Sequence, residues 1–160
     1  MSVSKYQPHL LVIPEDDANR QMANGFVLEL DCVRLRNIQV LQVAGGWMKV
    51  LKRFQSEHVS AMEMFPERLV VLLIDFDGKA DRLSEVAQTI PNHLIARVFI
   101  LGAWTEPEDL RERLGSYETI GKKMALDCRD NTNHIWGDNL LRHNVGELDR
   151  LRERVRPILF

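Results

Sequence analysis

Two aspartates, Asp75 and Asp77, directly follow the most apolar run of the sequence, in the stretch "LVVLLIDFDG". A run without polar alternates is typical of a strand that is buried on both faces of a sheet. If the extended conformation continues through Phe76, the two carboxylates point to the same side, because side chains alternate along a strand. The pair could then face one divalent cation.

Further acids follow two other apolar runs: Glu15 comes after residues 9–13, and "TEPED" comes after residues 96–101. Clustered carboxylates raise one another's pKa unless a cation holds them. Mg²⁺ and Mn²⁺ prefer such oxygen ligands, so we expect a site for one of these ions. The predicted ligands are Glu15, Asp75 and Asp77, with Asp81, Glu106 and Glu108 as additional candidates.

The acids also have a simpler interpretation. Asp16 or Asp17 could cap a helix that begins near Asn19, and Asp77 could cap one that begins near Lys79. Acidic side chains are favoured at these positions because they accept hydrogen bonds from free amides at the helix start. Metal binding and helix capping are therefore both open at this point.

Four apolar runs, residues 9–13, 38–43, 68–74 and 96–101, predict β-strands. The segments between them, residues 19–30, 47–65 and 79–90, have apolar residues at helical spacing. This alternation predicts an α/β fold, a Rossmann-like four-stranded parallel sheet in the order βαβαβαβ with helices on both faces. The carboxyl ends of such strands meet at one edge, where the acids of this sequence fall.

The remainder of the chain predicts a C-terminal helical extension. Thr105 and Glu108 have the spacing of a capping box, and the helix that they open is expected to continue to Cys128. A last helix is expected from Val145 to the residue before Pro157. A length of 160 residues suits one domain, 1–160, with a core at about 9–115 and an extension at about 116–160.

Basic residues gather in the stretch 32–56, which contains no acid. The paired glycines in "AGGW" allow a phosphate or backbone to come close, and the cations after them could follow a nucleic-acid backbone. A solvated helix face is the alternative for these cations. The candidate nucleic-acid-binding residues are Gly45, Gly46, Lys49, Lys52, Arg53 and Arg82.

Composition excludes some classes of protein. The net charge of −2 gives no global attraction to nucleic acid or membranes, so any contact with a polyanion must be local. The apolar runs are far shorter than the roughly 20 residues that span a bilayer, and "MSVSKYQPH" lacks a signal-peptide core. We therefore expect a cytoplasmic protein without a membrane partner. Cys32 and Cys128 lack CxxC spacing and are expected to be reduced thiols.

The order of a glutamate after the first strand, glycines after the second and a DxD pair after the third resembles a TOPRIM domain. The pattern is most similar to the nuclease-type, overcoming-lysogenization-defect-like members, and it covers about residues 9–115. The family usually has a glycine directly after the glutamate and an aspartate four residues beyond it, where this chain has Asp16 and Asn19. The long domains that accompany TOPRIM nucleases are missing from these 160 residues.

This resemblance implies metal-dependent phosphodiester chemistry on nucleic acid, as a nuclease or phosphotransferase component of a processing or defence system. Glu15 would act near the nucleophile or as a general base, and Asp75 and Asp77 would position Mg²⁺ or Mn²⁺. The alternative is a non-catalytic module that binds metal, nucleotide or a protein partner, a second copy included. A receiver-like signalling domain is a third interpretation, but a receiver has its acidic pair after the first strand.

The segment 134–144 contains His134, Trp136 and His143. It could fold over the acidic edge and supply a histidine for acid chemistry. Alternatively it caps and packs, with Trp136 as a core anchor.

Overall fold

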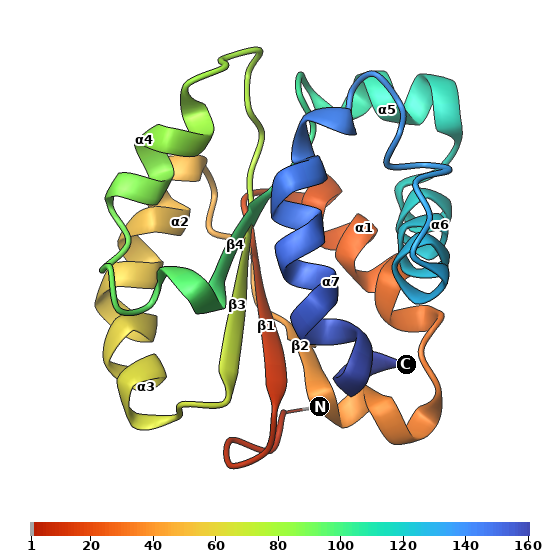
Figure 1. The fold of residues 1–160 in the computed structure, drawn as a ribbon. Helices are drawn as coiled ribbons and strands as arrows, with labels where there is room; N and C mark the ends of the chain where they lie inside the picture. The colour runs from red at the N-terminus through yellow and green to blue at the C-terminus, as the bar shows by residue number, and fades with distance from the viewer. Residues whose placement is uncertain (1) are drawn as a thin grey trace.

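The computed structural model describes residues 2–160 and contains one parallel sheet between two layers of helices (Figure 1). The α/β fold with helices on both faces is therefore confirmed. The strands run in the order β2-β1-β3-β4. They are β1 (His9–Pro14), β2 (Ile38–Val40), β3 (Arg68–Leu73) and β4 (Val98–Leu101).

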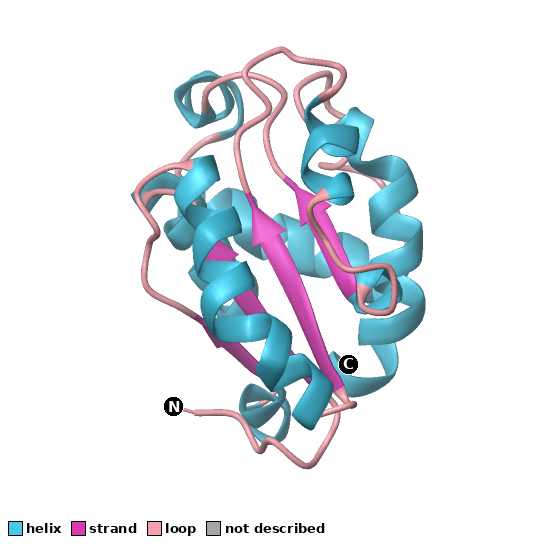
Figure 2. Cartoon of the chain, turned by 90° about the vertical axis from the view of Figure 1, so that its left-hand side faces the viewer, coloured by secondary structure: helices cyan, strands magenta, loops and turns pink. Residues whose placement is uncertain are grey.

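β1 occupies the middle of the sheet and pairs in parallel with both β2 and β3. Leu10 stands opposite Ile38 on one side and opposite Leu69 on the other. The chain thus leaves β1 first toward β2 and then crosses back to build β3, so the direction of winding changes between β1 and β3. Ligands of open parallel sheets bind at this type of switch point, at the carboxyl ends of the strands, which form the upper edge in Figure 2.

The helices divide between the two faces (Figure 1). One face is covered by α2 (Trp47–Arg53), α3 (Val59–Met64) and α4 (Arg82–Gln88). The other is covered by α1 (Asp17–Leu28), α6 (Tyr117–Asp130) and α7 (Val145–Leu159), with α5 (Pro107–Leu114) near the carboxyl edge. Short 3-10 turns lie at Cys32–Asn37, Ile95–Arg97 and Arg142–Asn144.

Strand side chains alternate between two apolar cores. Leu10 and Val12 join the core beneath α1, α6 and α7, whereas Leu11 and Ile13 join the core beneath α2 and α4. Val70, Leu72, Ile74 and Phe76 belong to this second core. Because neighbouring side chains face opposite ways, Phe76 points into the second core and Asp75 points toward α1.

Helix boundaries differ from the sequence prediction in three places. A π-helical turn at Phe54–His58 interrupts the predicted helix over 47–65. Gly115, with φ of 100°, ends α5 and separates it from α6, so the predicted single helix from Thr105 to Cys128 is two helices; a positive φ suits glycine because it has no Cβ. α7 continues through Pro157, which lies in its last turn and there removes only one late hydrogen bond.

The start of α5 also differs from the prediction. Glu106 occupies the N-cap position, and Thr105 donates its hydroxyl to Asp109 instead of forming a capping box with Glu108. Three strands are shorter than predicted, since β2 ends at Val40, β3 ends at Leu73 and β4 begins at Val98. In residues 2–160, no helix combines the length and apolar character needed to cross a membrane.

α1 and α6 pack closely because each presents a glycine to the other's backbone. A Cβ on Gly121 would lie 1.9 Å from the carbonyl oxygen of Met22, and one on Gly25 would lie 2.2 Å from that of Glu118. Neither backbone atom can move without shifting its helix. These two glycines therefore fix the separation of α1 from α6, and α1 in turn carries Asn19 to the carboxyl edge.

We expect Gly121→Ala to lower the free energy of unfolding by about 2 kcal/mol, since the added methyl group forces the helices apart. Urea denaturation measures this change. Gly146→Ala on α7 is the matched control, because a Cβ there meets nothing within 4 Å and alanine favours the helix. Equal stabilities of the two variants would contradict the close-packing argument.

Candidate metal and active site

Glu15 and Asp75, separated by 60 residues in the sequence, meet at the switch point between β1 and β3. The Glu15 Oε2 atom accepts a hydrogen bond of 2.7 Å from the backbone N–H of Asp75. Both residues directly continue their strands, since the Glu15 N–H donates to Leu73 and the Ile74 N–H donates to Leu101. The sheet therefore brings together the first two predicted site residues.

Asn19 completes this contact from α1. Its Nδ2 donates a hydrogen bond of 3.2 Å to Asp75 Oδ1, while Asp16 caps α1 by accepting the Asn19 N–H. Asn19 is fully buried, and its Oδ1 atom has no hydrogen-bond partner. The sequence analysis treated Asn19 as a departure from the TOPRIM pattern and not as a site residue. Its position four residues after Glu15 could have indicated that it lies beside the site.

The electrostatics of the contact favour a cation. Burial raises the pKa of Asp75 to about 8, and the nearby carboxylates of Glu15, Asp16 and Asp77 add to this effect against the hydrogen bond from Asn19. Burial also raises the pKa of Glu15, although the hydrogen bond from Asp75 opposes the shift. Neutral Asp75 predominates at pH 7, and a bound divalent cation would compete with its proton.

Asp77 is held differently from Asp75. It leaves the extended conformation, with φ of 52°, and its Oδ2 pairs with Arg82 Nη1 of α4 at 3.2 Å. α1 and α4 lie on opposite faces of the sheet, so the two aspartate carboxyls are held by helices on different faces. The expectation that both point to one side therefore fails at Asp77, because the strand geometry ends at Phe76.

Arg82 is the central cation of this edge. It is 1 % exposed, donates to the Asp75 carbonyl at 3.0 Å and stacks 4.1 Å above the ring of Trp47. A guanidinium held by a ring, a carbonyl and a carboxylate is fixed in orientation. Arg82 therefore supplies permanent positive charge next to the acids, and its Nε also lies 3.7 Å from Glu85 Oε2, three residues along the helix.

The oxygen donors fit one hydrated cation better than a closed cage. Within residues 2–160, no group of three or more His, Cys, Asp or Glu side chains is gathered closely enough to hold a metal. Mg²⁺ is commonly bound by only one or two carboxylates, with water and substrate phosphate as its other ligands. Glu15, Asp75 and the unpartnered Asn19 oxygen fit that arrangement.

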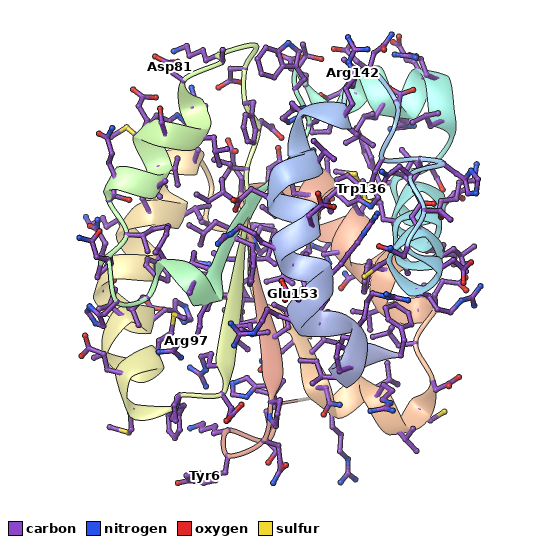
Figure 3. All side chains as sticks on the ribbon, viewed as in Figure 1. Tyr6, Asp81, Arg97, Trp136, Arg142 and Glu153 are labelled. Atoms are coloured by element: carbon purple, nitrogen blue, oxygen red, sulfur yellow. The ribbon has the colours of Figure 1, made fainter. Side chains whose placement is uncertain are left out.

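The additional candidate ligands lie away from this contact. Asp81 is exposed at the start of α4, where Figure 3 shows it at the outer margin of the molecule. Glu106 and Glu108 are exposed at the start of α5. These three acids occupy helix N-termini, where Asp81 and Glu106 are N-cap residues that make no side-chain capping hydrogen bond.

Apart from Arg82, the predicted nucleic-acid-binding residues fall into three groups. Arg53 donates to the carbonyls of Gln42 and Val43, so its guanidinium supports the loop after β2. Lys49 and Lys52 are exposed on α2. Gly45 and Gly46 have positive φ values of 92° and 148°, and the Gly45 N–H donates to the Glu15 carbonyl.

The segment 134–144 packs against the sheet edge. Trp136 is 6 % exposed and joins the core on the α1, α6 and α7 face, which matches the core-anchor interpretation. His143 lies with its ring 4.6 Å from Phe76 and 5.2 Å from Trp104, and burial lowers its pKa. The histidine therefore packs against two aromatic side chains next to the site residues.

Taken together, the fold and the edge define an α/β protein with an all-parallel sheet and a carboxylate contact at its switch point. Searches against protein-family models, curated proteins and solved structures found no match. The resemblance to TOPRIM domains therefore stays a prediction from the sequence motifs.

Proposed function

We propose that this protein binds Mg²⁺ or Mn²⁺ at Glu15 and Asp75 and hydrolyses phosphodiester bonds in nucleic acid. The contact of Glu15 with Asp75 at the switch point carries the proposal, because it joins two acids of raised pKa where parallel sheets bind ligands. The TOPRIM-like order of the motifs agrees with this chemistry.

The residues of the chain take distinct roles in this proposal. Glu15 and Asp75 hold the ion, and Asn19 orients Asp75 through its amide. The ion, when bound, polarises a phosphoryl oxygen and acidifies a water molecule. Arg82 lies beside the same carboxylates and stabilises negative charge on the phosphate, while Lys49 and Lys52 guide the nucleic-acid backbone.

Incubation with plasmid, single-stranded DNA and RNA in Mg²⁺ or Mn²⁺ tests the proposal. We expect cleavage that falls at least about 100-fold in Glu15→Gln and in Asp75→Asn, the scale of loss typical when a group that stabilises the transition state is removed. Asp17→Asn is the matched control, since Asp17 belongs to the same acidic run but pairs with Arg20 on the surface. Asp81→Asn should also keep full activity. Cleavage that survives in Asp75→Asn would exclude the proposed site.

A second function is favoured by one observation, the ion pair of Arg82 with Asp77. A resident guanidinium can take the place of an ion, and the domain would then be a non-catalytic module for a nucleotide or a protein partner. Calorimetric titration with Mn²⁺ separates the two candidates. Saturable binding that Asp75→Asn removes supports the first, whereas no binding together with no cleavage supports the second.

A further inference from the structure

The two outer strands of the sheet, β2 and β4, differ in the state of their free edges. An outer strand has backbone N–H and C=O groups that no neighbouring strand binds, and such groups pair readily with another extended chain. In β4, the Leu101 carbonyl accepts a hydrogen bond from the Ile74 N–H and therefore faces β3. The alternate residues Val98, Ile100 and Gly102 face outward, because the direction of the backbone groups alternates along a strand.

Side chains from the C-terminal segment bind each of these outward residues of β4. Glu147 Oε2 accepts a hydrogen bond of 2.9 Å from the Ile100 N–H, and Arg150 donates to the carbonyl at the start of the strand. Asn144 binds both the N–H and the C=O of Gly102. The outer edge of β4 is therefore closed to a further strand.

β2 has no such protection along its outer edge. The Leu41 N–H donates to β1, so the alternate residues Ile38, Val40 and Gln42 face outward. Arg53 of α2 donates to the Gln42 carbonyl. Within residues 2–160, no residue forms a hydrogen bond with the outward backbone groups of Ile38 and Val40. β2 lies at the left-hand margin of the sheet in Figure 2, so this edge is open.

The side chains around the open edge of β2 are basic and apolar. The stretch 32–56 contains no acid, and within residues 2–160 the two arginines shortly before β2, Arg34 and Arg36, form no ion pair. Three exposed apolar side chains flank the strand, those of Val33, Val43 and Met48. A second copy of this chain, paired edge to edge, would bring two basic stretches together, whereas an acidic peptide complements them.

We propose that the outer edge of β2 binds an extended acidic peptide of another protein, which adds one strand to the sheet. The main chain of the peptide pairs with Ile38 and Val40, and its carboxylates pair with Arg34 and Arg36. In this mode of recognition the main chain provides affinity, and alternate side chains provide specificity. The binding requires neither a metal ion nor cleavage, so it is independent of the proposed nuclease function.

The probe is an acetylated and amidated peptide in which Val and Thr alternate between terminal pairs of Glu, because Val and Thr favour the extended state. In ¹H–¹⁵N correlation spectra, titration with this Glu peptide should shift the backbone amides of Ile38 and Val40 saturably, with a Kd on the order of 0.1 mM. The same amides should exchange more slowly with solvent deuterium when the peptide is bound. The amide of Ile100 should not move, since Glu147 already binds it.

A second peptide and three variants separate the backbone from the charges. The Lys peptide, with Lys in place of every Glu, should bind at least about five-fold more weakly, because several exposed charge pairs change sign together. Val40→Pro removes the outward N–H but keeps the bonds to β1, so it should weaken binding of the Glu peptide at least about ten-fold. Arg36→Glu, an exposed change that leaves the backbone intact, should weaken it about five-fold and is the second variant in case Val40→Pro does not fold. Arg142→Glu, the same exposed change on the β4 side of the sheet, is the control and should bind the Glu peptide normally.

The proposal is wrong if the Glu peptide gives no saturable shift at Ile38 and Val40, if the two peptides bind equally, or if a folded Val40→Pro variant binds normally. Two further results would assign the edge to another occupant and overturn the proposal. A shift of the same amides on dilution of the protein alone would show that a second copy covers β2. Displacement of the Glu peptide from these amides by oligothymidylate would show that the edge belongs to a nucleic-acid interface.

Discussion

Asp75→Asn should make the protein more stable than the wild type, by a margin that grows by about 4 kcal/mol between pH 5 and pH 8. In the wild type, the folded state holds the Asp75 proton up to about pH 8, while the unfolded state releases it near the ordinary value of 3.8. The folded state therefore binds more protons between these values. Its stability falls as pH rises through this window, at up to about 1.4 kcal/mol per pH unit.

Urea denaturation at half-unit steps from pH 5 to pH 9 measures this slope. The raised pKa of Glu15 acts in the same direction, so a smaller slope should persist in Asp75→Asn. Asp17→Asn removes a neighbouring surface charge and should keep the wild-type slope. If the proposed ion binds, saturating Mn²⁺ should flatten the wild-type slope, because the ion replaces the proton. A wild-type stability that does not depend on pH would contradict the raised pKa.

Asp127→Ala should destabilise the protein by about 4 kcal/mol. The Asp127 carboxylate is 2 % exposed and accepts hydrogen bonds from Thr132 Oγ1 and from the backbone amides of His134, Ile135 and Trp136. Each bond to a charged acceptor contributes roughly 1.5–3 kcal/mol, and buried amides left without an acceptor add to the loss. The change also frees Trp136 from its place in the core.

The stability that Asp127 contributes depends on pH with the opposite sign from that of Asp75. Burial acts to raise the pKa of Asp127, but the hydrogen bonds from Thr132 and the three amides outweigh it and leave the pKa below its ordinary value. The stability that Asp127 contributes is therefore complete above the unfolded-state value, near pH 4, and is lost as pH falls through the folded-state pKa.

Denaturation in urea, followed by tryptophan fluorescence, measures the loss in Asp127→Ala. Asp130→Ala, three residues along α6, removes an exposed carboxylate that pairs with Arg129 on the surface, so it should leave the stability nearly unchanged. Thr132→Val removes a single bond to Asp127 and should lie between the two. An Asp127→Ala variant as stable as Asp130→Ala would contradict the anchoring role.

Much of the fold could be predicted because a strand that is buried on both faces has an uninterrupted run of apolar residues. The six apolar residues from Leu69 to Ile74 indicate a central strand, and β3 lies in the interior of the sheet. The placement of Glu15 beside Asp75 followed from the same reasoning, since both come directly after neighbouring strands. Helix ends were less predictable. The sequence pattern predicted one helix through to Cys128, but the positive φ of Gly115 divides it into α5 and α6.

The partners of the site residues could not be predicted from local pattern. Whether Asp77 faces Glu15 depends on its φ angle, and the left-handed value directs it to Arg82 instead. Asn19 meets Asp75 across 56 residues, through the packing of α1 on the sheet. Asp127 looked like an ordinary helical residue, because the amides that it binds come from a loop whose path only the tertiary structure defines.

The central position of β1 has a consequence for synthesis of the chain. β1 needs β3 as a neighbour, and β3 begins at Arg68, so the growing chain carries an apolar strand with one unpaired edge until that segment leaves the ribosome. Open edges of this type pair readily with other chains. A nascent chain that has reached β2 but not β3 therefore still has an open edge on β1, and in it Glu15 has not yet met Asp75.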